Sequence, residues 1–258
     1  MKVIILCGGK GYRLKEETEF KPKPMVLIGN KPILWHIMKI YTHFGFNEFI
    51  LALGYKGEYI KEYFLNQKFL TDDFTIHTYS GYTKIYKNDH NNKDNFVITL
   101  VDTGLDTMPG ERILRLKDFV PENDEDFMVT YGDGVSDVNI KELFKFHKKQ
   151  NTIGTITGVH PRIKYGLLTI NKKFVASKFA EKPVIKEWVN GGFMVFKKEF
   201  FSYIKKGEYE YQGIKRLIKG GQLSVFIHHG FWHSMDTYPD VDSLNKLWSE
   251  DPKWKLWK

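Results

Sequence analysis

The most constraining feature of this chain lies at its start, where a short apolar run ends in a cluster of glycines. Residues 3–7 read Val-Ile-Ile-Leu-Cys and contain no polar side chain. A run of this kind is typical of a strand buried on both faces of a parallel sheet. Gly8, Gly9 and Gly11 follow directly, and glycines after a strand let backbone N–H groups approach an anion closely. The opening therefore predicts a strand that ends in a phosphate-sized loop.

Strand and helix patterns alternate through the first 65 residues. In residues 32–44 the apolar side chains recur at helical spacing, with Pro32 suited to a helix start and Gly45 to its end. Residues 49–53 form a second apolar strand pattern, and residues 57–64 predict a second helix. This order indicates an α/β domain with a mainly parallel sheet.

The rest of the chain predicts further elements and no internal repeat. Up to residue 150 we expect three strands and two helices: strands at 74–78, 96–101 and 126–130, helices at 112–119 and 140–149. Beyond residue 150 strand patterns come closer together and predict a mixed or antiparallel extension: 153–159, 167–170, 193–196 and 223–227. Residues 84–94 are polar and predict an exposed loop. No linker is long enough to split the chain, so we expect one domain over residues 1–258.

Charge and cysteine content limit the classes of function. The 258 residues carry a formal charge of +8, which fits either a lysine-rich surface or attraction to anionic ligands such as nucleotides. The basic residues form no dense run, which argues against a nucleic-acid partner. Cys7 cannot form an internal disulfide because it is the only cysteine, and it is expected in the core. No run approaches the ~20 apolar residues of a membrane span, so we expect no membrane association and a cytoplasmic location.

Two common phosphate-binding motifs are excluded by the glycine loop itself. A Walker loop needs Ser or Thr after the lysine, but Lys10 is followed by Gly11. A dinucleotide fingerprint that begins at Gly9 would need a third glycine where Leu14 stands. An ordinary tight turn remains the alternative for the glycines taken alone.

A second segment, Lys21-Pro22-Lys23-Pro24-Met25, presents a lysine between two prolines. The prolines limit the flexibility of the backbone, so Lys23 is held in one direction. That suits a phosphate contact that is in place before the reaction begins. The alternative is an ordinary solvated loop lysine.

Two aspartates follow strand patterns far apart in the sequence. Asp133 lies between glycines after the strand at 126–130, and Asp236 lies in an aromatic segment after the strand at 223–227. Ligands of open α/β sheets gather at the carboxyl ends of strands, and Asp oxygens are natural ligands of Mg²⁺. The alternatives are an Asp-Gly turn for Asp133 and an Asp at a helix start for Asp236.

Taken in order, these segments resemble the sugar-phosphate nucleotidyltransferase family. The similarity rests first on the stretches 6–14, 21–25 and 28–34. Further stretches are similar, more narrowly, to glucose-1-phosphate cytidylyltransferases: 35–39, 54–57, 101–104, 131–135, 181–183, 190–193 and 230–232. The resemblance extends from residue 1 to about residue 250.

The resemblance implies a Rossmann-like nucleotidyltransferase fold, a mixed but mainly parallel sheet flanked by helices, and often an oligomer. It implies that CTP and a small phosphorylated acceptor react with Mg²⁺ as cofactor, and that pyrophosphate leaves. The nucleotide half would be about residues 1–135 and the acceptor half about 136–258. The implied catalytic residues are Arg13 and Lys23, and the implied metal ligands are Asp133 and Asp236. The implied nucleotide contacts are Leu6, Cys7, Gly8, Gly9, Lys10, Gly11, Tyr12, Arg13, Lys23, Thr107, Arg112 and Gly132, and the implied acceptor contacts are Glu181, Lys182 and Asn190.

The sequence departs from the family pattern mainly in the acceptor half. Tyr12 replaces a usual Thr, and Glu111 replaces a Gly of the glucose enzymes. A Trp-Glu-x-Glu-Pro-Leu stretch is missing near residues 208–217, His233-Ser234 replaces Gln-Pro, and residues 160–165 are more basic. Three hypotheses therefore stay open: transfer to glucose 1-phosphate giving CDP-glucose for surface polysaccharide, the same chemistry on another acceptor such as phosphoglutamine in capsule modification, or a non-catalytic nucleotide-binding regulatory subunit.

Overall fold

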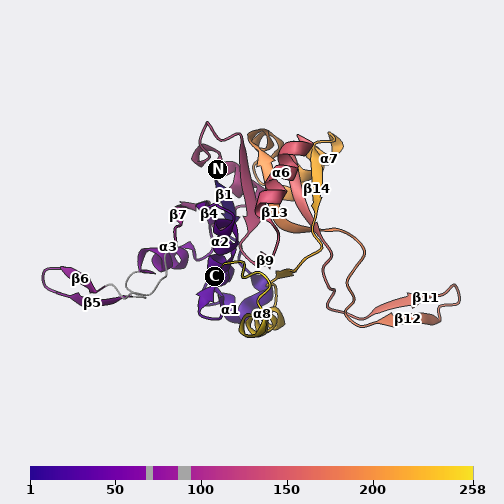
Figure 1. The fold of residues 1–258 in the computed structure, drawn as a ribbon, viewed down its shortest axis with the longest axis horizontal. Helices are drawn as coiled ribbons and strands as arrows, with labels where there is room; N and C mark the ends of the chain where they lie inside the picture. The colour runs from indigo at the N-terminus through magenta and orange to yellow at the C-terminus, as the bar shows by residue number, and fades with distance from the viewer. Residues whose placement is uncertain (68–71, 87–93, 258) are drawn as a thin grey trace.

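A seven-stranded sheet forms the centre of the molecule in a computed structural model that describes residues 1–67, 72–86 and 94–257 (Figure 1). The strand order is β14-β10-β13-β8-β1-β4-β7. β13 is antiparallel to both of its neighbours, and all other pairs in this sheet are parallel. In sheet order the bounds are Leu223–Ile227, Gly154–Val159, Val189–Lys197, Asp126–Tyr131, Val3–Leu6, Glu48–Leu53 and Val97–Asp102.

The pleat of β1 shows why the opening run is apolar throughout. Val3 and Ile5 pack into one hydrophobic cluster, and Ile4 between them packs into the other. All three are fully buried, because successive side chains of a strand point to opposite faces and both faces are covered. The first cluster includes residues of α2 (Ile33–His43), α3 (Gly57–Leu65), α6 (Ile140–Gln150) and α8 (Tyr238–Glu250); the second includes residues of α5 (Pro109–Arg115), α7 (Glu210–Lys219) and the 3-10 helix η4 (Lys198–Tyr203).

Short elements at the carboxyl edge of the sheet link segments that are far apart in the sequence. β9 (Gly134–Ser136) pairs antiparallel with β15 (Trp232–Ser234), and the backbone N–H of Met235 donates to the Asp133 carbonyl at 2.8 Å. This pairing brings the segment after β8 next to the segment before α8. The other short elements are η1 (Tyr12–Leu14), α1 (Lys15–Thr18), η2 (Lys23–Met25), β2 (Leu27–Ile28), β3 (Lys31–Pro32) and η3 (Lys117–Phe119).

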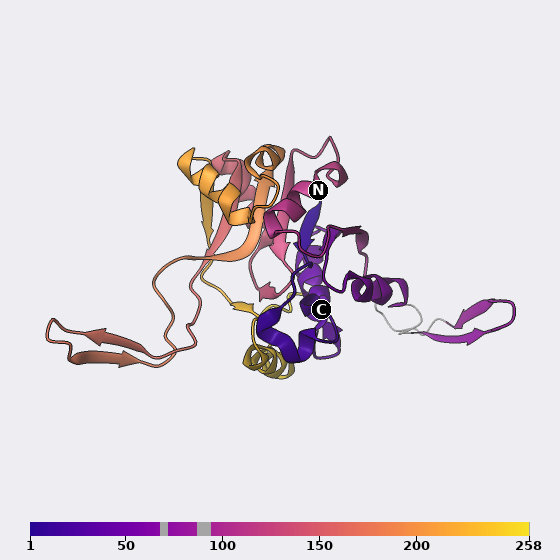
Figure 2. The ribbon, with the colours of Figure 1, turned by 180° about the vertical axis from the view of Figure 1, so that it is seen from behind.

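Two antiparallel hairpins project from opposite sides of the body (Figures 1 and 2). One consists of β5 (Asp73–Ile76) and β6 (Thr83–Tyr86), and the other of β11 (Leu167–Ile170) and β12 (Ala176–Ala180). Every residue of β5, β11 and β12 is exposed. The hairpins therefore add apolar surface to the molecule without contributing to its core.

The structure confirms the predicted fold class and most predicted elements. The helix predicted at 32–44 is α2, and Gly45 follows it with φ of +90°, a conformation that glycine adopts without strain. The small antiparallel extension is the β11–β12 hairpin, whereas the other strands expected beyond residue 150 lie in the central sheet. One sheet thus spans both proposed halves of the chain.

Two predictions need correction. The helix expected at 112–119 is α5, which begins at Pro109, followed by the separate turn η3. The exposed loop expected at 84–94 is wrong at both ends, because residues 84–86 belong to β6 and the Asp94 side chain is only 5 % exposed. Asp94 accepts hydrogen bonds from Trp35 Nε1 at 2.5 Å and Lys39 Nζ at 3.1 Å. Residues 87–93 of this prediction lie outside the described residues. Among the described residues, no helix is both long and apolar enough to span a membrane.

Candidate functional site

A pocket of about 420 Å³ opens where β1 and β8 end. Its walls come from the glycine loop after β1, from η2, from the loop before α5 and from the segment after β8. Except for Lys10, all residues predicted to contact the nucleotide line it, together with both predicted metal ligands. These lining residues are Leu6, Cys7, Gly8, Gly9, Gly11, Tyr12, Arg13, Lys23, Thr107, Arg112, Gly132, Asp133 and Asp236. Their contacts with a nucleotide stay predictions, but they share one pocket.

Arg112 packs against the glycine loop and binds its backbone. Its guanidinium donates to the carbonyl oxygens of Gly8 and Leu105 at 3.1 Å, Leu53 at 3.0 Å and Gly104 at 2.6 Å. A methyl group at Gly8 would overlap this guanidinium, so glycine is required for the close approach. Burial and, to a lesser extent, the neighbouring Arg115 lower the pKa of Arg112. Arg112 therefore fixes the loop backbone and also contributes a buried positive charge beneath an anion pocket.

Lys10 is directed away from the pocket. Its Nζ forms an ion pair with Asp106 Oδ1 at 2.8 Å. Asp106 belongs to the loop that also carries Thr107, so the pair connects the glycine loop to the opposite wall. Both side chains are partly or largely exposed, so the pair adds little to stability.

Gly132 and Cys7 show how closely the strand ends approach each other. A Cβ at Gly132 would lie 2.9 Å from the Leu6 carbonyl oxygen and from Pro24 Cγ, so no larger residue fits without movement. Cys7 is 1 % exposed, which confirms its expected place in the core. Burial, and secondarily Asp133, raises the pKa of the Cys7 thiol. The thiol is therefore protonated and is not a nucleophile.

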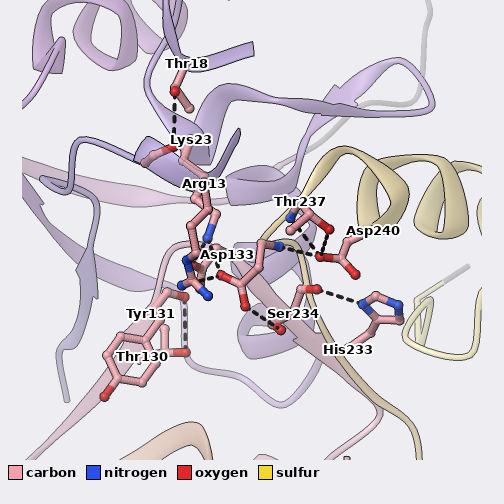
Figure 3. A network of polar contacts seen from close by, with 12 residues as sticks. Arg13, Thr18, Lys23, Thr130, Tyr131, Asp133, His233, Ser234, Thr237 and Asp240 are labelled. Carbon is pink, nitrogen blue, oxygen red and sulfur yellow. Dashed lines mark hydrogen bonds and ion pairs between the residues drawn. The ribbon is translucent and has the colours of Figure 1, made fainter. Parts of the chain in front are cut away.

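Four charged side chains that line this pocket meet in one network of polar contacts (Figure 3). Lys23 Nζ lies 2.5 Å from Asp133 Oδ2 and 2.9 Å from Asp236 Oδ1. Arg13 Nη2 lies 2.8 Å from the same Asp236 oxygen. Ser234 Oγ donates to Asp236 Oδ2 at 3.1 Å. The two aspartates therefore converge on one cationic centre although 103 positions separate their residue numbers, 133 and 236.

The charges of this cluster support one another. Burial alone would lower the pKa of Lys23, but Asp133 and Asp236 outweigh it and raise that pKa above its usual value. Burial alone would raise the pKa of Asp236, but Lys23 and Arg13 outweigh it and lower that pKa. Lys23 is therefore protonated and Asp236 ionised at neutral pH.

The helix α8 does not use Asp236 at its start. Its N-cap is Thr237, and the backbone N–H groups of Asp236 and Thr237 donate to Asp240 Oδ2 at 3.0 and 2.7 Å. Asp240 thus supplies the charge at the helix N-terminus, and the Asp236 side chain is directed to Lys23 and Arg13. Among the described residues, no group of three or more His, Cys, Asp and Glu side chains is arranged to hold a metal ion. A cation here would therefore be held by two carboxylates and by ligands from a substrate.

A second pocket of about 260 Å³ adjoins the charged cluster. It shares Arg13, Tyr131, Asp133 and Asp236 with the first pocket and adds Thr130, Gly134, Gly191, Gly192, Trp232 and Ser234. Asn190, a predicted acceptor contact, directly precedes the lining residues Gly191 and Gly192. Its Oδ1 accepts a hydrogen bond from the Gly192 N–H at 3.0 Å.

The other predicted acceptor contacts lie farther out. Glu181 and Lys182 are exposed at the root of the β11–β12 hairpin. Lys182 lines a third pocket of about 760 Å³, which meets the second at Trp232 and Ser234. Glu181 lines none of the three pockets and lies beside Gly166.

Sequence reasoning missed several lining residues, above all Tyr131, Trp232 and Ser234. Tyr131 and Trp232 belong to the stretches 131–135 and 230–232 that carry the resemblance, so the sequence offered a signal for both residues. Gly191 and Gly192 follow Asn190 in the same way. No local pattern indicates that Ser234 bonds Asp236.

Comparisons with known proteins identify the class of protein that shares this arrangement. The family model described as nucleotidyl transferase matches residues 2–233. Glucose-1-phosphate cytidylyltransferase of Salmonella typhimurium is 42 % identical over 262 residues, covering all of both chains. A Bacillus subtilis protein named as a probable glucose-1-phosphate cytidylyltransferase is 41 % identical over 261 residues, again covering all of both chains. Among solved structures, HddC from Yersinia pseudotuberculosis complexed with GMP-PN has a TM-score of 0.68 at 20 % identity, covering 95 % of this chain and 98 % of that one; this likeness concerns the fold.

Proposed function

The chain belongs to the nucleotidyl transferase family, and from that premise we propose that it transfers CMP from CTP to glucose 1-phosphate and releases pyrophosphate. The relatives that are about 42 % identical over their full length carry this activity in their names. The observation that carries the proposal is the convergence of Arg13, Lys23, Asp133 and Asp236 between two adjoining pockets.

The reaction needs positioning and charge more than covalent chemistry. A phosphate oxygen of the acceptor forms a bond to the α-phosphorus of CTP, and the bond from that phosphorus to the β-phosphate oxygen breaks. The attacking oxygen is already ionised, so no general base is required. The glycine loop over Arg112 would bind the nucleotide phosphates through its backbone. Arg13, whose side chain is 74 % exposed and pairs with Asp236, would exchange this partner for the departing pyrophosphate.

Lys23 links the two pockets. Its ammonium group is within 3 Å of both aspartates, and it lines the first pocket, which we term the nucleotide pocket. Once Asp133 and Asp236 hold another cation, the ammonium is available to bridge the α-phosphate and the acceptor phosphate. There it would offset the negative charge that gathers in the transition state.

The donor set fits a magnesium ion, the cofactor that the proposal includes. Mg²⁺ is usually bound by one or two carboxylates together with substrate phosphates, and Asp133 and Asp236 already converge on one positive charge. When bound, the ion would polarise the α-phosphate.

The direct test is pyrophosphate release by the purified chain with Mg²⁺, glucose 1-phosphate and each of CTP, UTP, ATP and GTP. The proposal predicts turnover with CTP and much less with the other three. Turnover only with another nucleotide would contradict the CTP assignment. No pyrophosphate release with any of the four nucleotides, with either glucose 1-phosphate or phosphoglutamine as acceptor, would favour a non-catalytic nucleotide-binding subunit.

A second candidate keeps the chemistry and changes the acceptor, and one feature of the third pocket favours it. Five basic residues line this pocket: His160, Arg162, Lys164, Lys182 and His233. Among the described residues that line it, the only acidic one is Asp240, which is paired with Lys164 at 2.6 Å. Arg162 donates to the Lys182 carbonyl oxygen at 3.0 Å, and neither side chain forms an ion pair with a carboxylate of the described residues. The pocket could therefore bind the carboxylate of an acceptor such as phosphoglutamine.

Substitution of Arg162 distinguishes the two acceptors. If the third pocket binds a carboxylate, Arg162→Met raises KM for phosphoglutamine and leaves KM for glucose 1-phosphate nearly unchanged. Lys178→Met, on the exposed strand β12, is the matched charge control. Efficient turnover of glucose 1-phosphate but none of phosphoglutamine by the wild-type chain would eliminate the second candidate.

The proposal includes assembly with further copies of this chain and a cytoplasmic location. Two-stranded hairpins are marginally stable alone in water, and the β11–β12 hairpin exposes Leu167, Leu168, Ile170, Phe174, Val175 and Phe179 by 51 to 86 %. In the described residues each strand of this hairpin pairs only with the other. A second copy that covers these side chains would remove them from water.

Light scattering after size exclusion tests this assembly. A mass above that of the 30.3 kDa chain is expected, and Phe179→Ser should reduce it. Phe20→Ser is the control, because Phe20 and Phe179 are similarly exposed at 68 and 66 % and only Phe179 lies on the hairpin. A monomeric wild-type chain would refute assembly.

A further inference from the structure

Glu210, the first residue of α7, is a buried carboxylate whose contacts lead to the site. Its residue is 8 % exposed, and its Oε1 accepts a hydrogen bond from the Tyr131 hydroxyl at 2.8 Å. Its other oxygen, Oε2, is buried without a hydrogen-bond partner among the described residues. A buried, unsatisfied carboxylate oxygen is costly. Stabilisation of α7 alone does not explain a glutamate that is placed in this way.

Tyr131 is the wall that the two substrate pockets share. It is the last residue of β8, and it lines both the nucleotide pocket and the second pocket, which we term the acceptor pocket. In Figure 3 its ring lies beside the charged cluster, and its hydroxyl points away from that cluster. The hydrogen bond to Glu210 therefore holds the end of the ring that is remote from the reacting groups.

The ring is fixed on another side by Gly192. This residue has φ of +83°, and a Cβ there would lie 2.6 Å from Tyr131 Cδ2. The backbone of Gly192 thus packs directly against the ring.

Glu210 also lies where α7 meets the other wall of the nucleotide pocket. The N–H of Glu111 donates to the Glu208 carbonyl at 3.1 Å, and a Cβ at Gly110 would lie 2.7 Å from the Glu210 nitrogen. Because α5 begins directly after Thr107 and Met108, this contact ties the start of α7 to the loop that lines the nucleotide pocket.

We propose that Glu210 is a positioning residue that holds Tyr131 between the two pockets and so sets the approach of the acceptor phosphate to the α-phosphorus. The inference rests on the proposed nucleotidyl transfer and concerns the geometry of that reaction. Glu210 acts through Tyr131 and touches neither substrate. A displacement of about 1 Å in the shared wall can cost about 10²-fold in rate, because in-line attack depends on alignment.

Three variants test this role by pyrophosphate release, with CTP binding measured separately by calorimetry. Glu210→Ala should lower kcat by about 10- to 100-fold while the affinity for CTP and the thermal midpoint change little. Glu210→Gln should recover most of kcat, because its amide oxygen still accepts the Tyr131 hydrogen bond. Tyr131→Phe, which keeps the ring and loses only the hydroxyl, should also lower kcat.

The combination of two variants gives the decisive readout. In a Tyr131→Phe background, Glu210→Ala should cause little further loss, because the contact through which Glu210 acts is already absent. A full, additive loss in that background would overturn the proposal, as would wild-type kcat in Tyr131→Phe or in folded Glu210→Ala. If Glu210→Ala does not fold, Tyr131→Phe alone decides. A lowered kcat in Tyr131→Phe supports the proposal, and a wild-type kcat overturns it. An inactive wild-type chain would instead count against the proposed function itself.

Discussion

The nucleotide side and the acceptor side of this site are built in different ways. The proposed nucleotide pocket includes a glycine loop after the parallel strand β1, and the buried Arg112 holds the backbone of that loop in place. The pockets proposed for the acceptor add aromatic and basic side chains from β15 and from the root of an exposed hairpin. Backbone donors suit phosphates, which all nucleotides share, whereas side chains can change with the acceptor. The same sheet can therefore support one chemistry on several acceptors.

Removal of the Lys23 charge should have the largest effect, because this residue joins the two sides. We expect Lys23→Met to lower kcat by about 10²–10³-fold, the usual cost of losing a group that offsets developing charge. It would also leave Asp133 and Asp236 without their shared cation. Lys21→Met is the matched control, since Lys21 pairs with Glu17 on the surface. Equal activity of the two variants would show that Lys23 does not link the pockets.

Gly8→Ala tests whether the nucleotide side depends on backbone geometry. The new methyl group would overlap the Arg112 guanidinium, so we expect a loss of about 1–3 kcal/mol in the free energy of unfolding and weaker CTP binding. Gly9→Ala is the control, because a Cβ at Gly9 meets nothing within 4 Å. Chemical denaturation and calorimetric CTP titration measure both effects. Equal stability of the two variants would argue against the close contact between Gly8 and Arg112.

A smaller effect, on stability alone, tests the contact between His36 of α2 and Trp254 near the end of the chain. This contact joins the two proposed halves. His36 of α2 is buried, with Nε2 3.0 Å from the Ile28 carbonyl oxygen and Nδ1 3.4 Å from Trp254 Nε1. These contacts require a neutral ring that donates from Nε2 and accepts at Nδ1. Burial accordingly lowers the pKa of His36 from 6.5 to about 4.

The stability contributed by neutral His36 is complete above pH 6.5 and is lost as pH falls from 6.5 towards 4, because only the unfolded chain takes up the proton in that interval. The loss should be about 3 kcal/mol. Urea unfolding at pH 7 and pH 4 should show this loss in the wild-type chain and a smaller one in His36→Gln. His43→Gln, on an exposed part of the same helix, should behave like wild type. An identical pH dependence in all three would show that Trp254 is held in another way.

The same contrast explains what the sequence could predict. Strands β1, β4 and β8 are nearly or fully buried, so their apolar runs stand out and their carboxyl ends locate the nucleotide pocket. Helices α7 and α8 were not predicted. α7 nevertheless carries Ile214, Leu217 and Ile218, and α8 carries Val241, Leu244 and Trp248, at the three- and four-residue spacing of an amphipathic helix. The helical pattern was therefore present in the sequence, and what it does not give is where the two helices pack against the sheet.

The site shows the same limit. The glycine loop and the Lys23 segment are local motifs, and the residues in them could be named from the sequence together with the family resemblance. The pairing of Lys23 with both aspartates depends on the contact between β9 and β15, which no local pattern encodes. Lys10 illustrates the opposite case, since a neighbouring loop supplies Asp106 and draws the lysine out of the pocket.

The central claim is that Asp133 and Asp236 together hold the cation required for nucleotidyl transfer. Pyrophosphate release from CTP and glucose 1-phosphate by Asp133→Asn tests it most directly, with phosphoglutamine assayed in parallel. The control is Asp137→Asn, four residues away in the same segment, where the carboxylate pairs with His228 at 2.8 Å. We predict that Asp133→Asn remains folded and loses turnover with either acceptor, while Asp137→Asn remains active. Undiminished turnover by Asp133→Asn would contradict the assignment of the site.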